Sequence, residues 1–232
     1  MNKEFEKHIE RNAEQKRAVV LLSGGLDSAL CLGLARTYDW ECHCLIVDYD
    51  QRNAVAETGA ARWIAAHYQQ EMRNLRVDLS GLAPSPLTGL PQVEPRTLGE
   101  IREAEGDSPY VVPGRNLILL SLANALADSL GISVLVIGAN LEDWAGFPDC
   151  RPEFFDAFEK VSGKTVIHPL TQMRKQDVAW TARKLGVPIE KTVSCYYAKS
   201  REHCGRCDAC MIRREAFELA GVEDSTVYAG GA

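Results

Sequence analysis

The chain has 232 residues, of which 46% are hydrophobic and 25% charged, as expected for one globular domain with, at most, a small appendage. Its formal net charge of −6 argues against nucleic acid as a partner. No apolar stretch approaches the roughly 20 residues that cross a bilayer. The charged N-terminus does not resemble a secretory signal, so we expect a cytoplasmic protein with no membrane partner.

The first elements in chain order place a glycine pair between a strand and a helix. Residues 2–15 suit a short polar helix, set before an α/β nucleotide-binding domain at 16–190. A buried strand at 18–22 leads through Ser-Gly-Gly-Leu-Asp-Ser into a helix at 28–37. Adjacent glycines let a ligand approach the backbone, and the helix start presents free N–H groups. This arrangement predicts an anion site, whereas the alternative is a turn that only joins the two elements.

The side chains of this loop indicate which anion it holds. Ser23 and Ser28 add hydroxyl donors, whereas Asp27 would repel a phosphate unless a divalent cation lay between them. We therefore predict a Mg²⁺-assisted pyrophosphate site, distinct from the G-x-x-x-x-G-K-[ST] loop, which is absent. The expected ATP-binding residues are Leu22, Ser23, Gly24, Gly25, Leu26, Asp27 and Ser28.

The rest of the chain alternates short apolar runs with helical patterns. Further strands are expected at residues 41–47, 71–79, 133–137 and 165–167, and further helices at 53–67, 116–130, 153–161, 175–185 and 208–220, with a plain loop at 138–152. This alternation predicts an α/β fold, a Rossmann-like doubly wound, mostly parallel five-stranded sheet covered on both faces. Ligands of such sheets collect beyond the carboxyl ends of the strands, so the loops after strands one, two and four should meet at one cavity.

One long connection interrupts the alternation. Residues 80–110 are rich in proline and glycine, and a connection of this length is unusual in a compact domain. We interpret it as a lid or a dimer-contact segment; plain disorder is the alternative.

Four of the eight cysteines crowd into the sixteen residues 195–210. Two consecutive C-x-x-C steps are typical of a closed, structural Zn²⁺ site with four thiolate ligands. The expected metal ligands are Cys195, Cys204, Cys207 and Cys210. An iron–sulfur cluster and four unrelated buried thiols are the alternatives. We expect a small zinc-binding helical segment at 191–225, followed by a tail at 226–232.

Three loops combine polar groups with aromatic ones. They cover residues 48–53, 112–116 and 140–151, and they suit a flat heteroaromatic ligand with hydrogen-bonding edges. Trp144 or Phe147 can stack on a ring, and Asp143 or Asp149 can accept from a ring N–H or an exocyclic amine. Arg115 or Arg151 can hold a carboxylate or phosphate, although each of these residues also has an ordinary structural explanation.

The motifs together resemble one family. The loop at 23–28, Asp-Tyr-x-Gln-Arg at 48–52, Pro-Gly-Arg-Asn at 113–116, Gly-Phe-Pro-Asp-Cys-Arg-Pro-Glu-Phe at 146–154 and the cysteine tail occur in order. They resemble the QueC family, the 7-cyano-7-deazaguanine synthases of the ATP pyrophosphatase (PP-loop) superfamily, over residues 17–221.

The resemblance implies a reaction and its participants. The expected reaction is ATP-dependent conversion of 7-carboxy-7-deazaguanine and ammonia into 7-cyano-7-deazaguanine, through an acyl-adenylate and an amide. ATP with Mg²⁺, one structural Zn²⁺ per chain and a homodimer are implied too. Candidate catalytic residues are Asp27, Ser28, Arg115 and Asp143. Candidate substrate-binding residues are Gln51, Arg115, Asn116, Asn140, Asp143, Gly146, Phe147, Asp149 and Arg151.

Several positions depart from the family pattern. Asp50 replaces a glycine, Asn53 a histidine, Ala145 a serine and Phe147 a tyrosine. A lost buried hydrogen-bond partner costs about 1–3 kcal/mol, which is enough to change substrate preference. One alternative is therefore a PP-loop paralogue that adenylates a related acid or a tRNA base, as an amide-forming or thiolating enzyme; thiolation would need Cys150. A non-catalytic nucleotide-binding module is the other.

Overall fold

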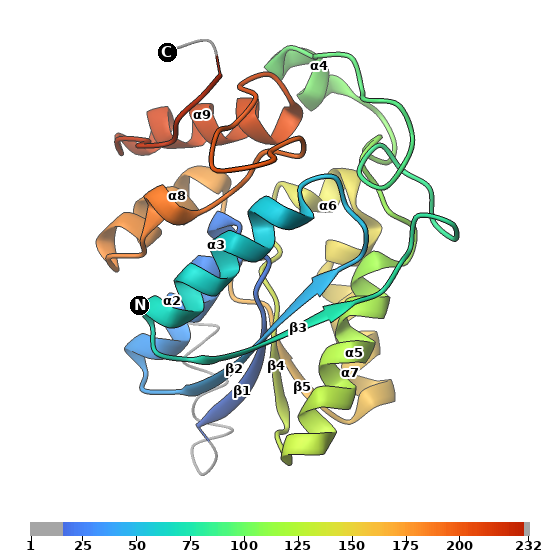
Figure 1. Cartoon of the computed structure of the whole chain (residues 1–232), viewed down its shortest axis with the longest axis vertical. Helices are drawn as coiled ribbons and strands as arrows, with labels where there is room; N and C mark the ends of the chain where they lie inside the picture. Colours follow the sequence, from blue (N-terminus) through green and yellow to red (C-terminus); the bar gives the residue numbers. More distant parts are fainter. Residues whose placement is uncertain (1–15, 230–232) are drawn as a thin grey trace.

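A computed structural model describes residues 16–229 and shows one parallel sheet with helices on both faces (Figure 1). The helix expected at residues 2–15 lies outside the described residues. The strands are β1 (Arg17–Leu21), β2 (Glu41–Asp48), β3 (Glu71–Arg76), β4 (Val134–Val136) and β5 (Thr165–Ile167). They lie in the order β3-β2-β1-β4-β5, and every neighbouring pair is parallel. The expected doubly wound fold is confirmed, with a sheet that is parallel throughout.

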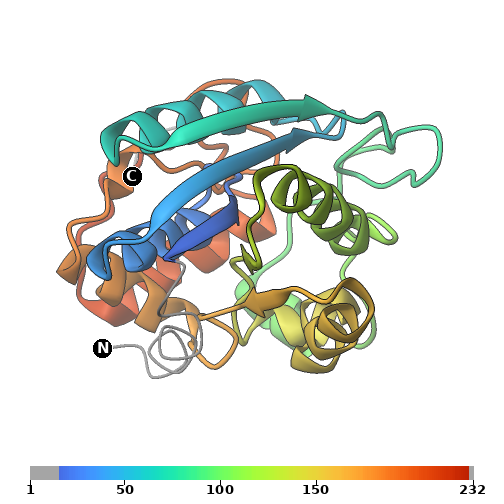
Figure 2. The same cartoon turned by 90° about the horizontal axis from the view of Figure 1, so that it is seen from below.

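The helices form two layers, between which Figure 2 shows the sheet. One face carries α2 (Leu26–Thr37), α3 (Ala54–His67) and α8 (Lys175–Lys184), with α9 (Asp208–Ala220) packed against α8. The other face carries α5 (Arg115–Leu130) and α7 (Pro152–Ser162). After β3 the chain returns to place β4 beside β1, so the strand order reverses between β1 and β4, where α/β sheets bind their ligands.

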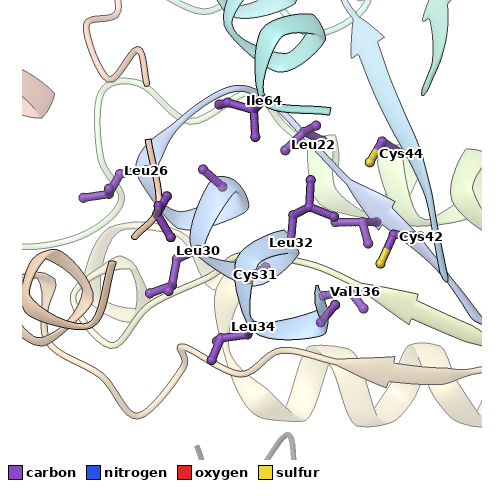
Figure 3. Close-up of a cluster of buried hydrophobic side chains, with 14 of the residues drawn as sticks. Leu22, Leu26, Leu30, Cys31, Leu32, Leu34, Cys42, Cys44, Ile64 and Val136 are labelled. Carbon is purple, nitrogen blue, oxygen red and sulfur yellow. The ribbon is translucent and has the colours of Figure 1, made fainter. Parts of the chain in front are cut away.

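Burial on both sides explains why the central elements are so apolar. Alternate residues of β1 belong to the two cores: Ala18 and Val20 to one, Val19 and Leu21 to the other. Helix α2 is buried almost all round, and Figure 3 shows Leu32 on the side of Cys42 and Cys44 of β2, with Leu26 and Leu30 on the opposite side of the helix. A helix enclosed in this way needs apolar residues on every side.

Two sequence predictions need correction at the ends of elements. Strand β3 ends at Arg76 rather than at residue 79, because the Asp78 carboxylate accepts from the Ser80 N–H at 2.9 Å and turns the chain away. The region 138–152, expected as a plain loop, contains α6 (Asp143–Gly146) and the 3₁₀ helix η1 (Pro148–Cys150). Such one-turn helices are too short to leave a periodic pattern.

Residues 80–110 are folded against the domain, which contradicts the alternative of plain disorder. Leu87 and Tyr110 belong to a small buried cluster that also contains Tyr49, and α4 (Leu98–Glu103) begins with a capping box between Thr97 and Glu100. Figure 1 shows α4 beside α9. A last short 3₁₀ helix, η2 (Ile189–Lys191), precedes the cysteine segment. Within residues 16–229, no helix is long and apolar enough to cross a membrane.

Candidate active site

A cavity of about 820 Å³ opens at the point where the strand order reverses. It is bounded by the loop after β1, the end of β2, the start of α5, the loop after β4, residues 96–110 and the cysteine segment. The loops after strands one, two and four therefore meet, as predicted from the parallel sheet.

The loop after β1 forms a cradle of backbone groups. Gly24 has φ +86°, and a Cβ atom there would lie 2.6 Å from the carbonyl oxygen of Glu57, so only glycine fits. Gly25 is the N-cap of α2 and provides no side-chain cap, which leaves the N–H groups of the first turn available to an anion. Ser23 and Ser28 lie with their hydroxyl oxygens 3.1 Å apart. These contacts fit the predicted phosphate site.

Asp27 forms an ion pair with Lys175, a residue that was not predicted from the sequence. The Lys175 ammonium donates to Asp27 Oδ2 at 2.5 Å, whereas Asp27 Oδ1 is buried and has no hydrogen-bond partner among residues 16–229. Burial lowers the pKa of Lys175, but the carboxylates of Asp27 and Asp143 outweigh it and raise the pKa. The sequence contains one indication of this pairing. Lys175 is the first residue of α8, where a positive charge opposes the helix dipole, so a nearby anion is expected.

Asn140 joins Asp27 to a second carboxylate. Its Nδ2 donates to Asp143 Oδ2 at 2.7 Å and to Asp27 Oδ2 at 3.4 Å. Burial raises the pKa of Asp143 to about 6, a rise that the Lys175 charge reduces. A carboxylate with a pKa close to neutrality can exchange protons with a substrate.

Arg115 places a positive charge on the cavity wall, close to several titratable groups. It begins α5 and donates to the Tyr49 hydroxyl at 3.5 Å. Burial disfavours its charged form, but Tyr49, Cys150 and Asp149 raise its pKa. The Arg115 charge lowers the pKa values of both Glu57 and Asp143, so its field covers carboxyls on both sides.

The structure divides the predicted substrate residues into two groups. The cavity wall includes Arg115, Asn116, Asn140, Asp143, Gly146 and Phe147. Gln51, Asp149 and Arg151 are not part of this wall. Asp149 accepts from the backbone N–H of Asn116 at 3.0 Å, and Arg151 donates to the carbonyl of Trp144 at 3.0 Å. These three support neighbouring groups, and their assignment to the substrate stays a prediction.

Besides Lys175, three further wall residues were not predicted from the sequence. Tyr110 and Tyr196 lie with ring centroids 4.4 Å apart, and both line the cavity together with Glu57. The Glu57 carboxylate accepts from Gln51 Nε2 at 2.9 Å and from Asn53 Nδ2 at 3.1 Å. A glutamate and two tyrosines in separate segments carry no spacing signal, so only the folded chain brings them together.

The four clustered cysteines converge. Their sulfur atoms all lie within 4.8 Å of one another, a set that fits a structural metal ion and contradicts the alternative of four unrelated thiols. Backbone N–H groups of Tyr197 and Cys204 donate to Cys195 Sγ at 3.4 and 3.3 Å. Tyr196 and Asp208, each adjacent to a cysteine of the cluster, reach the cavity wall, so the cysteine cluster borders the cavity.

Comparison with known proteins matches a family over most of the chain. The profile of the family described as queuosine biosynthesis protein QueC covers residues 17–221. The 7-cyano-7-deazaguanine synthase of Anaeromyxobacter dehalogenans (strain 2CP-C) is 42% identical over 228 residues, which cover 94% of this chain and 97% of that protein. The 7-cyano-7-deazaguanine synthase of Thermoplasma acidophilum is 41% identical over 225 residues, covering 93% of each.

Solved structures show the same fold at much lower sequence identity. The NMN synthetase from Francisella tularensis superposes with a TM-score of 0.56 at 15% identity, covering 96% of this chain and 87% of that chain. That likeness shows the fold alone. The family match and the relatives at about 40% identity confirm the resemblance stated from the motifs: this chain belongs to the QueC family.

Proposed function

We propose that this chain is an ATP-dependent nitrile synthase that converts 7-carboxy-7-deazaguanine and ammonia into 7-cyano-7-deazaguanine, in queuosine biosynthesis. One observation carries the proposal. This chain belongs to a family whose relatives are named 7-cyano-7-deazaguanine synthase, and its PP-loop at residues 23–28 lies on the wall of a cavity large enough for two ligands.

ATP would bind with its phosphates in the loop after β1. The free N–H groups at the start of α2 and the hydroxyls of Ser23 and Ser28 are suitable donors for phosphate oxygens. Asp27 Oδ1, which has no hydrogen-bond partner in the described part of the chain, is a suitable ligand for Mg²⁺, which when bound would neutralise part of the phosphate charge. Lys175 would then turn from Asp27 toward the phosphates, as a second positive charge.

The first half of the reaction activates the acid. A carboxylate is a poor electrophile because its oxygen leaves poorly, so the carboxylate oxygen attacks the α-phosphorus of ATP and pyrophosphate departs. Arg115 holds the acid in line with ATP, which is the main contribution that the site needs to make. Ammonia then attacks the acyl carbon, AMP leaves with the carboxyl oxygen, and Asp143 accepts the proton released from nitrogen.

The second half removes the remaining oxygen. The amide oxygen attacks the α-phosphorus of a second ATP, and pyrophosphate departs as the nitrogen loses one proton. AMP then leaves with that oxygen, the nitrogen loses its last proton, and the nitrile forms. Because water would hydrolyse the acyl-adenylate, we assign to residues 96–110, which line the cavity, the role of a cover that excludes water.

The remaining assignments concern the metal and the assembly. We assign one Zn²⁺ per chain to the four cysteines, because a closed set of four thiolates is the usual structural zinc site. It would hold residues 191–225 as a segment distinct from the nucleotide-binding domain at 16–190. A cytoplasmic homodimer, in which residues 80–110 act as lid or subunit contact, completes the proposal.

The thiolating alternative has little support at Cys150. This thiol lines the cavity, but burial raises its pKa and keeps it protonated, whereas sulfur transfer needs a nucleophilic thiolate. The substitutions Asp50, Asn53, Ala145 and Phe147 remain the reason to test the substrate directly.

Mass spectrometry of the products tests the function. Incubation with ATP, Mg²⁺, ammonium and 7-carboxy-7-deazaguanine should yield the nitrile, AMP and pyrophosphate. Limiting ATP should let the amide accumulate. Pyrophosphate release that does not depend on the 7-carboxy compound, or formation of the amide alone under excess ATP, would contradict the proposal.

A further inference from the structure

The cavity has two chemically different ends beyond the phosphate loop. One end is apolar, with Leu21, Leu45, Val47, Leu119 and Ile137 on its wall. The other end joins Tyr49, Glu57, Tyr110, Arg115 and Tyr196, so it combines aromatic faces with one carboxylate and one guanidinium. The second end suits a ring that has hydrogen-bond donors on one edge and acceptors on another.

Glu57 is the carboxylate of this polar end, and it is held rigidly. Gln51 and Asn53 each donate to a different oxygen of the carboxylate, at 2.9 and 3.1 Å. Both amides are themselves fixed: Gln51 Oε1 accepts from the Tyr49 N–H at 2.8 Å, and Asn53 Nδ2 also donates to the Cys195 carbonyl at 3.0 Å. A carboxylate locked in this way is preorganised for recognition.

The carboxylate has capacity left for a ligand. Each oxygen can accept more than one hydrogen bond, and each has a single side-chain partner among the described residues. Burial raises the pKa of Glu57 to about 7, so two further donors would stabilise its charged form. A guanine-type ring offers such a pair, an endocyclic N–H beside an exocyclic amine, in the geometry that a carboxylate accepts with both oxygens.

We propose that Glu57 recognises the ring N–H and the exocyclic amine of the 7-deazaguanine ring, and so makes the enzyme select 2-amino rings. The proposal rests on the proposed function, for which it names the recognition residue. Arg115 would meet the acceptor edge, where the ring carbonyl lies beside the carboxylate. Tyr196 would flank the ring face. Asn53, which stands where the family usually has histidine, becomes a positioning residue that ties Glu57 to the cysteine segment.

Binding of two rings without a carboxylate tests this proposal separately from turnover. Calorimetry with 7-deazaguanine and with 7-deazahypoxanthine, which lacks the amine, should give a ratio of dissociation constants on the order of 10- to 100-fold in the wild type. In Glu57→Gln the ratio should fall to about 3-fold or less, because the amide presents only one acceptor. The matched control Glu142→Gln, a carboxylate elsewhere on the same wall, should keep the wild-type ratio.

The outcomes separate recognition from a merely structural role. A structural role would weaken both rings equally and leave the ratio unchanged in Glu57→Gln, which would overturn the proposal, as would equal binding of both rings by the wild type. If Glu57→Gln does not fold, Asn53→Ala decides, because it removes one support of the carboxylate: a lowered ratio supports the proposal and an unchanged ratio overturns it. Nitrile formation by the wild type, measured in parallel, shows whether the proposed function fails independently.

Discussion

The two halves of the cavity are built in opposite ways. The phosphate half is contiguous, because residues 22–28 supply the loop, its hydroxyls and Asp27. The opposite half is assembled from β2, α3, α5, the segment before α5 and the cysteine segment, each of which contributes part of the wall. The contiguous half depends on local backbone geometry, whereas the assembled half depends on packing between distant segments. Variants should therefore affect the two halves differently.

The largest effect is expected in the contiguous half. Asp27→Ala should lower kcat by at least about 100-fold, because it removes the proposed cation ligand and the partner of Lys175. Asp27→Asn, which keeps the size but not the charge, should be almost as inactive. Steady-state pyrophosphate release measures the loss, and circular dichroism checks that the fold is kept. Turnover within a few-fold of wild type in either variant would contradict the role of Asp27.

The next largest effect, on the free energy of unfolding, is expected from a substitution in the four-cysteine cluster. Cys207→Ser should lose the bound metal and destabilise residues 191–225, with a cost of roughly 4 kcal/mol or more. Metal analysis and thermal unfolding measure both changes. Cys42→Ser is the matched control, because that buried thiol lies in the core away from the cluster and its loss should not change the metal content. A Cys207→Ser protein that keeps its metal and melts like the parent would rule out a structural metal at this position.

The proposed role of Asp143 as proton acceptor predicts that the rate of amide formation depends on pH. Asp143 has a pKa raised to about 6 and accepts a proton only as the carboxylate, so the rate of amide formation should fall about 10-fold per pH unit below that value. The rate should be expressed per concentration of free ammonia, because ammonium is itself protonated in this range. Asp143→Asn should be slow, with no inflection near pH 6. An unchanged inflection in that variant would assign the titration to another group.

The smallest effect is expected for residues 96–110, which line the assembled half of the cavity. Arg96 pairs with Asp208, whose side chain is only 6% exposed, whereas Arg102 pairs with Glu215 and is itself 61% exposed. Arg96→Ala leaves a buried carboxylate unpaired and should cost about 1–3 kcal/mol, with a raised KM for the acid. Arg102→Ala, the matched control, should cost about 1 kcal/mol or less. Urea unfolding and limited proteolysis of residues 80–110 compare the two variants. Equal effects would show that the Arg96–Asp208 pair does not hold residues 96–110 in place.

The residues that line the cavity could be predicted only in part, because several distant segments meet there. The sequence suggested residues 140–151 for the ring, and Asn140, Asp143 and Phe147 do line the cavity. It did not predict that Glu57 and Tyr196 join them, because neither belongs to a spaced motif. It also suggested Gln51 for the substrate; in the structure Gln51 is not part of the cavity wall and donates to Glu57, and its assignment to the substrate stays a prediction.

The sequence by itself determined the features that depend on neighbours along the chain. Paired glycines between a strand and a helix specify an anion cradle, cysteine spacing specifies a four-thiolate cluster, and alternating apolar runs specify a parallel sheet. Only the tertiary structure decided that Lys175 lies against Asp27, that Glu57 is held by two buried amides, and that residues of the segment 96–110 line the cavity. Lys175 and Asp27 lie 148 positions apart, and long-range packing leaves no periodic trace in an amino-acid sequence. Gln51 and Asn53 lie only six and four positions from Glu57, but it is the fold that brings Glu57 to the cavity wall.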